Sequence, residues 1–399
     1  MKKQFLLYIL IIVLAIFVFF FFKTKNENQE KNTIVFWTLQ LGTFDKYINE
    51  IITTFEKENP EYKIKWIDIP YSEGEKRTLA AVLTDNPPDL VNLTPDFSLL
   101  LAQKKALEPI KKEKLEQFVP SIIETLKYND KYFGIPFYAT SAITLKNKEL
   151  TDKSIKTYDE LLETHPQNNS YITMINFAEN DTLLKLLNKY GINSAENINS
   201  AKSISLYEKF KKIYDNGAIP KESITQTHRD ALEKYMSGQL MYLVTGANFL
   251  NMIKENAPTI YKNTEVLSQL TGDTNAYDYS LMNFVIPKRA KNKDLALEFA
   301  LYFTNEINQL EFAKLTTILP VNKTTLDNEY FKNAKTNDIQ TQARIISAKQ
   351  LNNLQAPVKN IKNKKELNTL SANYIQEILI NNADIKETLD KFAQDWKKL

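Results

Sequence analysis

Few residues of this 399-residue chain could form a reaction centre of a familiar kind. The two histidines, His165 and His228, stand in separate polar segments and lack the H-x-x-x-H or H-E-x-x-H spacing of zinc sites. There is no cysteine, and the eight glycines form neither a G-x-G-x-x-G motif nor a Walker loop. We therefore predict a binding protein without metal or cofactor, not an enzyme. The 48 acidic residues leave a glycosidase-type carboxylate pair open.

Residues suited to binding a small polar molecule follow the predicted strands. Gln40, Thr43 and Phe44 lie after the first strand, and Asp96 lies after the third. Loops at the carboxyl ends of parallel strands meet at one edge of a sheet, where open α/β sheets bind ligands. Thr43 and Asp96 have a competing role as helix N-caps, which we favour for Thr43 and weigh evenly for Asp96. Gln40 has no capping duty and is a ligand candidate.

The elements that carry these loops alternate between strand and helix. The first part of the chain is predicted to form, in order, a strand at 33–38, a helix at 45–59, a strand at 62–69, a helix at 73–84 and a strand at 90–93. This order indicates a doubly wound, mainly parallel sheet. A second α/β run covers roughly 171–255. The C-terminal helix has a buried stripe that includes Trp396, which we expect in the core and not at a ligand.

Length and charge narrow the class of protein. A chain of 399 residues exceeds one ordinary core, so two domains are expected. Its apolar fraction of 43% suits a globular body. A net charge of +3 gives no argument for a nucleic-acid partner, which would need a concentrated basic face.

Phe5–Phe22 is an unbroken apolar run preceded by Lys2 and Lys3. As a helix of 18 residues it would span about 27 Å at 1.5 Å per residue, close to the hydrocarbon thickness of a membrane. The run ends in phenylalanines and Lys23 without a small-residue cleavage site, so we predict an uncleaved anchor over 1–24, with a cleaved signal as the alternative. The polar segment 25–32 is predicted to be a tether. Lysines on both sides of the run leave its orientation open.

Residues 283–322 form the most informative segment of the chain. A short apolar strand stops at Pro287, and a basic turn leads to what we predict to be one amphipathic helix, followed by Leu319-Pro320-Val321. The buried face of that helix would consist of Leu295, Phe299, Phe303, Ile307, Leu310 and Ala313.

Four further segments accompany it in order: Phe36-Trp37-Thr38, Pro88–Val91, Tyr132–Leu150 and Met236–Gly246. Together the five segments resemble family 1 extracellular solute-binding proteins, the sugar-binding subunits of ABC importers, to which maltose-binding proteins belong. The resemblance covers nearly the whole chain after residue 32.

The resemblance implies a two-lobed periplasmic-binding-protein fold of type II, in which each lobe is a mainly parallel sheet flanked by helices. Lobe 1 would hold 33–139 and 286–321, and lobe 2 would hold 140–285 and 322–399. The implied function is a monomeric receptor on the extracytoplasmic face of the cytoplasmic membrane. It would close its lobes around a sugar, oligosaccharide or polyol and present it to ABC permease subunits. An extracytoplasmic glycan hydrolase and a receptor for a non-sugar solute are the alternatives.

The resemblance also implies ligand contacts. Tyr138 and Thr140 match the family's pocket segment, although many sugar-binding members carry an acidic residue where this chain has Thr140. Asn248 stands where a tryptophan is common, and it could instead cap the following helix. Glu179 and Asp278 could replace the missing acid. The full set of expected ligand residues is Gln40, Phe44, Asp96, Tyr138, Thr140, Glu179, Asn248, Tyr277 and Asp278.

Overall fold

The computed structural model describes residues 32–399, with the exception of 168, 334–337 and 355–362. The chain divides into two compact units. Unit 1 comprises the described residues up to Tyr138, Leu281–Leu315 and Pro320–Thr325. Unit 2 comprises Ala139–Ser280, Thr316–Leu319 and Leu326–Leu399. Two strands, β6 (Ile135–Asn147) and β9 (Tyr279–Val285), each begin in one unit and end in the other.

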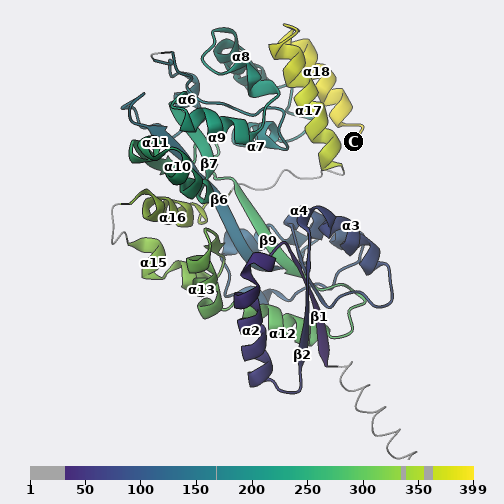
Figure 1. Ribbon diagram of the computed structural model, residues 1–399. Coiled ribbons are helices and arrows are strands. Elements are labelled where there is room, and N and C mark those ends of the chain that lie inside the picture. The colour runs from purple at the N-terminus through teal and green to yellow at the C-terminus, as the bar shows by residue number, and fades with distance from the viewer. Residues whose placement is uncertain (1–31, 168, 334–337, 355–362) are drawn as a thin grey trace, which may run out of the picture. The chain divides into compact units, whose positions relative to one another are not determined.

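Unit 1 is built on a sheet with the strand order β6-β9-β3-β1-β2 (Figure 1). Its other strands are β1 (Thr33–Leu39), β2 (Lys63–Ile69) and β3 (Leu90–Leu93), with a small hairpin of β4 (Lys127–Tyr128) and β5 (Lys131–Tyr132). Its helices are η1 (Gly42–Phe44), α2 (Asp45–Glu58), α3 (Tyr71–Val82), α4 (Pro95–Gln103), η2 (Lys112–Leu115), α5 (Pro120–Glu124), α12 (Lys293–Phe303) and α13 (Glu306–Leu315). β1 pairs in parallel with β2 and β3, as predicted, whereas β9 pairs antiparallel with β3.

Aromatic rings fill the core between the unit 1 sheet and its helices. Phe36 on β1 is fully buried and meets Phe284, Phe299 and Phe303 edge-on, with ring centroids 5.3–5.6 Å apart. Phe55 on α2 also contacts Phe299 on α12, at 5.1 Å. Edge-to-face pairs of this kind add to the gain from burying apolar area. The packing explains why the apolar stripes of both helices face the sheet.

The prediction of one helix after Pro287 is wrong, because two separate helices, α12 and α13, follow that residue. α12 ends at Phe303, and the side chain of Asn305 then accepts a hydrogen bond from the backbone N–H of Asn308 at 2.9 Å. This local cap starts a second helix, α13. Ile307, expected on the buried face, is 71% exposed, and Gln309 is buried in its place.

A buried carboxylate ties β1 to the start of α12 within unit 1. Asp89 is 4% exposed and accepts hydrogen bonds from the backbone N–H groups of Val35, Lys291 and Asn292 at 2.9, 3.0 and 2.9 Å. Without Asp89, each of these N–H groups would lose this hydrogen-bond acceptor. Asp89 therefore joins the first strand to a segment that lies some 200 residues beyond Asp89 in the sequence.

Unit 2 shares β6 with unit 1 and adds β7 (Tyr242–Gly246) and β8 (Thr264–Ser268). Its helices are α6 (Tyr158–Leu162), α7 (Thr182–Asn188), α8 (Ala201–Asp215), η3 (Lys221–Ile224), α9 (His228–Met236), η4 (Ala247–Phe249), α10 (Leu250–Asn256), α11 (Pro258–Lys262), α15 (Glu329–Lys332), α16 (Ile339–Gln350), α17 (Lys364–Leu379) and α18 (Ile385–Trp396). The short elements β10 (Leu319–Pro320) and α14 (Lys323–Leu326) lie at the unit boundaries. Both β7 and β8 pair antiparallel with β6. The prediction of a mainly parallel sheet in the second lobe is therefore wrong for these two strand pairs. The prediction followed from the resemblance, whereas the central strand of this unit, β6, arrives from the other unit and runs opposite to both of its partners.

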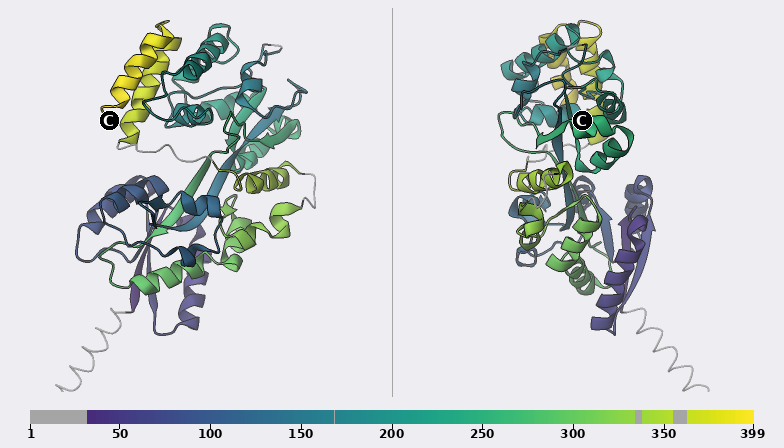
Figure 2. Two further views of the ribbon diagram at one scale, coloured as in Figure 1. Left: turned by 180° about the vertical axis from the view of Figure 1, so that it is seen from behind. Right: turned by 60° about the vertical axis from the view of Figure 1, so that its left-hand side comes forward.

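The C-terminal helices pack together within unit 2. α17 and α18 lie side by side next to α8, as all three views agree (Figures 1 and 2). Leu389 and Phe392 of α18 are fully buried, and the half-buried Trp396 stacks on Phe392 with ring centroids 5.5 Å apart. The expectation that Trp396 lies in the core is confirmed in part, since its ring packs against the core but stays half-buried.

No helix in the part of the chain that the structure describes is long and apolar enough to cross a membrane. The predicted anchor, Phe5–Phe22, lies outside the described residues.

Replacing Asp89 by alanine should lower the free energy of unfolding by about 3–5 kcal/mol, because three backbone N–H groups lose their buried acceptor. Asp85→Ala is the matched control. Its carboxylate lies in the same loop, is 96% exposed and pairs with Arg289 at 3.3 Å, so its loss should change stability by less than about 1 kcal/mol. Urea denaturation of both variants measures the difference. Equal effects would contradict the role assigned to Asp89.

Candidate functional site

The loop after β1 has a conformation that few residues adopt. Gln40 has a positive φ of 55°, and its backbone N–H donates to the carbonyl of Ile69, at the end of β2, at 2.8 Å. A positive φ is costly for a residue with a side chain, so the surroundings must hold it. The Gln40 side chain is exposed, so its amide is open to solvent.

Asp68 on β2 holds this loop. One carboxylate oxygen accepts from the Thr38 hydroxyl at 2.6 Å and the Leu41 N–H at 2.9 Å, while the other accepts from the Gly42 N–H at 2.8 Å. The indole N–H of Trp66 donates to the same Thr38 hydroxyl at 2.8 Å. A Cβ at Gly42 would lie 3.1 Å from the carboxylate, so the small residue lets the backbone approach closely. Sequence reasoning missed Asp68, because its partners become neighbours only through the parallel pairing of β1 and β2.

The cap expected from Thr43 is not formed. Thr43 lies inside η1, and α2 begins after Phe44, without a side-chain cap. η1 continues directly into α2, and the Asp45 N–H donates to the Gly42 carbonyl. A side-chain cap is therefore not needed at the start of α2. Asp96 is likewise not an N-cap: Thr94 occupies that position, and Asp96 is the second residue of α4 and exposed. α4 follows β3, which runs parallel to β1, so Asp96 and Gln40 leave the same edge of the unit 1 sheet.

Phe312 on α13 brings two predicted ligand residues together within unit 1. Phe44 meets its ring edge-on at 5.4 Å, and Tyr138 meets it at 6.2 Å, while Tyr47 stacks on it at 5.3 Å. Burial, with a smaller contribution from nearby Tyr71, raises the pKa of the Tyr138 hydroxyl to about 12, so the phenol stays neutral. Sequence reasoning did not assign Phe312 to this group, because its position depends on the break between α12 and α13.

In unit 2, Thr140 and Asn248 lie at the same end of an antiparallel strand pair. Ala142 on β6 is opposite Gly246 on β7, with Thr140 two residues before the first and Asn248 two residues after the second. Both side chains are exposed. The Asn248 carboxamide folds over Gly246, where a Cβ would overlap its oxygen. Asn248 does not cap α10, whose N-cap is Phe249. The amide is therefore open to a ligand.

Glu179 reaches the same strand end through His228. One Glu179 oxygen accepts the backbone N–H of His228, the first residue of α9, at 2.6 Å. The His228 ring nitrogen Nε2 lies 2.9 Å from the hydroxyl of Thr245 on β7, and its ring meets Phe249 edge-on at 5.4 Å. Burial lowers the pKa of His228, and the Glu179 carboxylate opposes this. Sequence reasoning set His228 aside, because no second histidine stood at metal-ligand spacing.

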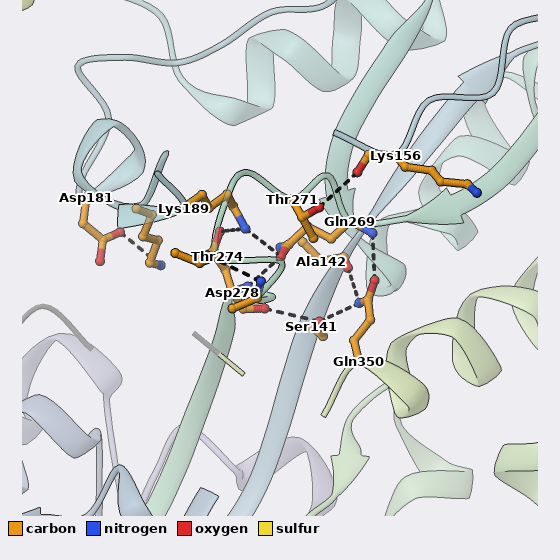
Figure 3. A network of polar contacts seen from close by, with 12 residues as sticks. Ser141, Ala142, Lys156, Asp181, Lys189, Gln269, Thr271, Thr274, Asp278 and Gln350 are labelled. Carbon is orange, nitrogen blue, oxygen red and sulfur yellow. Dashed lines mark hydrogen bonds and ion pairs between the residues drawn. The ribbon is translucent and has the colours of Figure 1, made fainter. Parts of the chain in front are cut away.

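The carboxylate of Asp278 is paired with a buried lysine (Figure 3). The Lys189 side chain is 1% exposed, and its ammonium group lies 2.9 Å from Asp278 and 3.1 Å from the Gln269 amide oxygen. That same oxygen accepts the Asp278 N–H at 2.6 Å. Burial lowers the pKa of Lys189, and Asp278 opposes this shift. Asp278 thus has a structural partner, which reduces its capacity to replace the acid absent at Thr140.

The network continues from Asp278 to β6. The Ser141 hydroxyl donates to the Asp278 carbonyl at 3.3 Å, and the buried Gln350 side chain donates to Ser141 at 2.7 Å and to the Ala142 carbonyl at 2.8 Å. Gln350 in turn accepts the Gln269 N–H at 2.7 Å. Tyr277 is held separately, through its backbone N–H, by the carbonyl of Asn353 at 3.0 Å. The loop that carries Tyr277 and Asp278 is therefore fastened next to Thr140.

One cavity of unit 2 lies away from these residues. It has a volume of about 330 Å³ and lies between α6 and α8, with His165, Lys209 and Lys212 in its lining. None of the nine predicted ligand residues lines it. Over the described ranges, no group of three histidine or acidic residues could hold a metal ion.

Comparisons with known proteins place this chain among solute-binding proteins. Residues 50–339 match the family of bacterial extracellular solute-binding proteins. A galactooligosaccharide-binding protein of Bacillus subtilis (strain 168) is 21% identical over 377 residues, which cover 88% of this chain and 86% of the relative. A maltotriose-binding protein of Pyrococcus abyssi is 29% identical over 106 residues, about a quarter of either chain.

Solved structures show the same fold. A periplasmic-binding protein of Synechococcus sp. MITs9220, assigned to oligosaccharides, superposes with a TM-score of 0.80 at 26% identity, over 92% of this chain and 98% of that one. A solute-binding protein of Staphylococcus aureus in complex with maltose has a TM-score of 0.74 at 17% identity, over 92% and 97% of the two chains. These likenesses confirm the two-lobed α/β fold class.

Lys189→Met should lower the free energy of unfolding by about 3–5 kcal/mol, because it leaves the partly buried Asp278 carboxylate without its cation. The control is Lys185→Met, which removes a 43% exposed lysine 3.1 Å from Asp181 on the same helix and should cost about 0.5 kcal/mol or less. Denaturant titration compares the two. A Lys189→Met protein as stable as its control would show that the pair does not hold this loop.

The stability of the protein should depend on pH through His228. Because the folded-state pKa is lowered, the unfolded chain binds the proton more tightly, and stability is lost as pH falls from about 6.5 through the folded-state pKa. In His228→Gln this part of the pH dependence should disappear, while His165→Gln, an exposed control, should keep it. Thermal melts between pH 8 and 5 provide the test. Parallel profiles for wild type and His228→Gln would refute the assignment.

Proposed function

The chain belongs to the family of bacterial extracellular solute-binding proteins, and we propose that it is the saccharide receptor of an ABC importer. The observation that carries the proposal is the ring group around Phe312 beside the loop of Gln40 in unit 1. Saccharides are recognised by aromatic rings that stack on C–H faces and by planar polar groups that bind hydroxyls. Phe44 and Tyr138 supply the first kind of group, and the Gln40 amide supplies the second.

Unit 2 adds polar groups of the same kind: two are uncharged, and one is a single carboxylate. Thr140 and Asn248 offer an exposed hydroxyl and an exposed carboxamide. Glu179 uses one oxygen on the His228 N–H, and its second oxygen can accept from a sugar hydroxyl. Such a set suits a neutral polyhydroxylated ligand. The galactooligosaccharide and maltotriose bound by the relatives support this ligand class.

The proposed mechanism is reversible binding without bond cleavage. The two lobes close around the solute, and the closed form delivers it to the permease subunits. We further propose that Phe5–Phe22 anchors a monomeric protein to the membrane, with units 1 and 2 on the extracytoplasmic face.

A thermal-shift screen of the full-length chain against maltotriose, galacto-oligosaccharides, polyols and non-sugar solutes tests the function. The detergent must lack a sugar headgroup, since a maltoside would compete. A ligand at 100 times its Kd should stabilise the protein by about 2.7 kcal/mol. Chromatography must then recover the saccharide intact. Shortened saccharide would favour a glycan hydrolase, and stabilisation by non-sugar solutes alone would favour another kind of receptor.

Tyr138→Ala should weaken binding of the saccharide found in that screen by about tenfold, which corresponds to 1.4 kcal/mol, because the ring that contacts Phe312 is lost. Trp396→Phe is the control, since that ring packs on Phe392 in α18 and should leave affinity unchanged. Calorimetry measures both. Undiminished affinity in Tyr138→Ala, with an intact fold by circular dichroism, would place the ligand elsewhere.

A further inference from the structure

An exposed aromatic ring stands at the edge of unit 1 that carries the Gln40 loop. Tyr71 is 53% exposed, and among the described residues it is the one aromatic in the group of large hydrophobic side chains open to solvent. The other members of that group are aliphatic. Tyrosine combines an apolar ring with a polar hydroxyl and is enriched where proteins contact ligands or partners. The open ring of Tyr71 is therefore available to a ligand.

The backbone fixes Tyr71 beside the loop that follows β1. It is the first residue of α3 and comes directly after Pro70 at the end of β2. Ile69, two residues earlier, accepts the N–H of Gln40 at 2.8 Å. One turn into α3, Gly74 packs so closely on Leu39 that an added Cβ would lie 2.5 Å from the leucine side chain. Two independent contacts thus press the start of α3 against the end of β1.

Tyr71 also lies near the ring group around Phe312. Its phenol is close enough to that of Tyr138 to contribute to the raised pKa of Tyr138. Phe44 and Tyr138 are themselves half-buried against Phe312, so part of each ring is already covered. Tyr71 keeps more than half of its surface open. Of these three rings, Tyr71 therefore has the most exposed surface available to a ligand.

Two of the charged side chains that follow Tyr71 on α3 neutralise each other, since Glu73 and Arg77 form an ion pair at 2.5 Å. The ligand of the proposed function is a neutral saccharide. A tyrosine offers such a ligand a stacking face and one hydroxyl that both donates and accepts.

We propose that Tyr71 is a ligand-contacting residue, whose ring stacks on a sugar ring of the bound saccharide next to the Gln40 amide. This inference rests on the proposed function and adds a contact that sequence reasoning did not single out. Tyr71 extends the aromatic surface of unit 1 from Tyr138 to the end of β2, and so lengthens the saccharide that the surface can accept.

Calorimetry on the full-length protein, with maltotriose and a galacto-oligosaccharide as probes, tests the contact. Tyr71→Ala should weaken binding about tenfold, while Tyr71→Phe, which keeps the stacking face, should stay within about threefold. Leu83→Ala is the matched control, because Leu83 is 72% exposed at the other end of α3 and should have no effect. Nitration of tyrosine by tetranitromethane, mapped by mass spectrometry, gives a second readout: saturating saccharide should protect Tyr71.

Each outcome decides between the claims. A wild-type protein that binds saccharide, with Tyr71→Ala equally tight and Tyr71 nitrated at the same rate with or without ligand, overturns the Tyr71 contact and leaves the proposed function standing. A wild-type protein that binds no saccharide overturns both. Loss of affinity in Leu83→Ala as well would mean that α3 acts through its fold, and would also overturn the contact.

Discussion

The ion pair between Lys189 and Asp278 is the constraint on which the arrangement of unit 2 depends. An ammonium group with 1% of its side chain exposed is tolerable only with a carboxylate and further acceptors in place. The cost of burying that charge forces the loop before β9 into one position. Gln269 binds both partners of the pair, and Gln350 carries the restraint to Ser141 on β6. The two strands that pass between the units are therefore fastened near each boundary by one polar network.

The polar residues fall into two groups: those that hold the scaffold and those that the scaffold leaves open. Asp278 serves the scaffold in unit 2, and Asp68 does so in unit 1, where it holds the strained loop of Gln40. With both carboxylates occupied, the proposed saccharide contacts fall to side chains that the scaffold leaves open, such as Thr140 and Asn248. A rigid scaffold beneath such side chains reduces the entropy lost when a ligand binds.

Local sequence patterns predicted most helices and strands, but they did not predict which distant residues contact one another. The strand Leu90–Leu93 was predicted to the residue, because a short apolar run between turn residues has few alternatives. The break at Asn305 was missed, since the cap depends on one side chain within an otherwise continuous apolar stripe. The strand order supplied Gln40, Phe44 and Asp96 as candidate ligand residues, and the family resemblance supplied Tyr138, Thr140 and Asn248. The pairing of Lys189 with Asp278 and the position of Phe312 could not be derived, because periodicity carries no information about contacts between distant segments.

Native mass spectrometry of the full-length protein, released from a detergent without a sugar headgroup, tests the central claim most directly. A saccharide receptor should retain one maltotriose or galacto-oligosaccharide per chain, and the mass of the released ligand should equal that of the saccharide added. A protein that retains no saccharide, or that releases shortened fragments, would contradict the account.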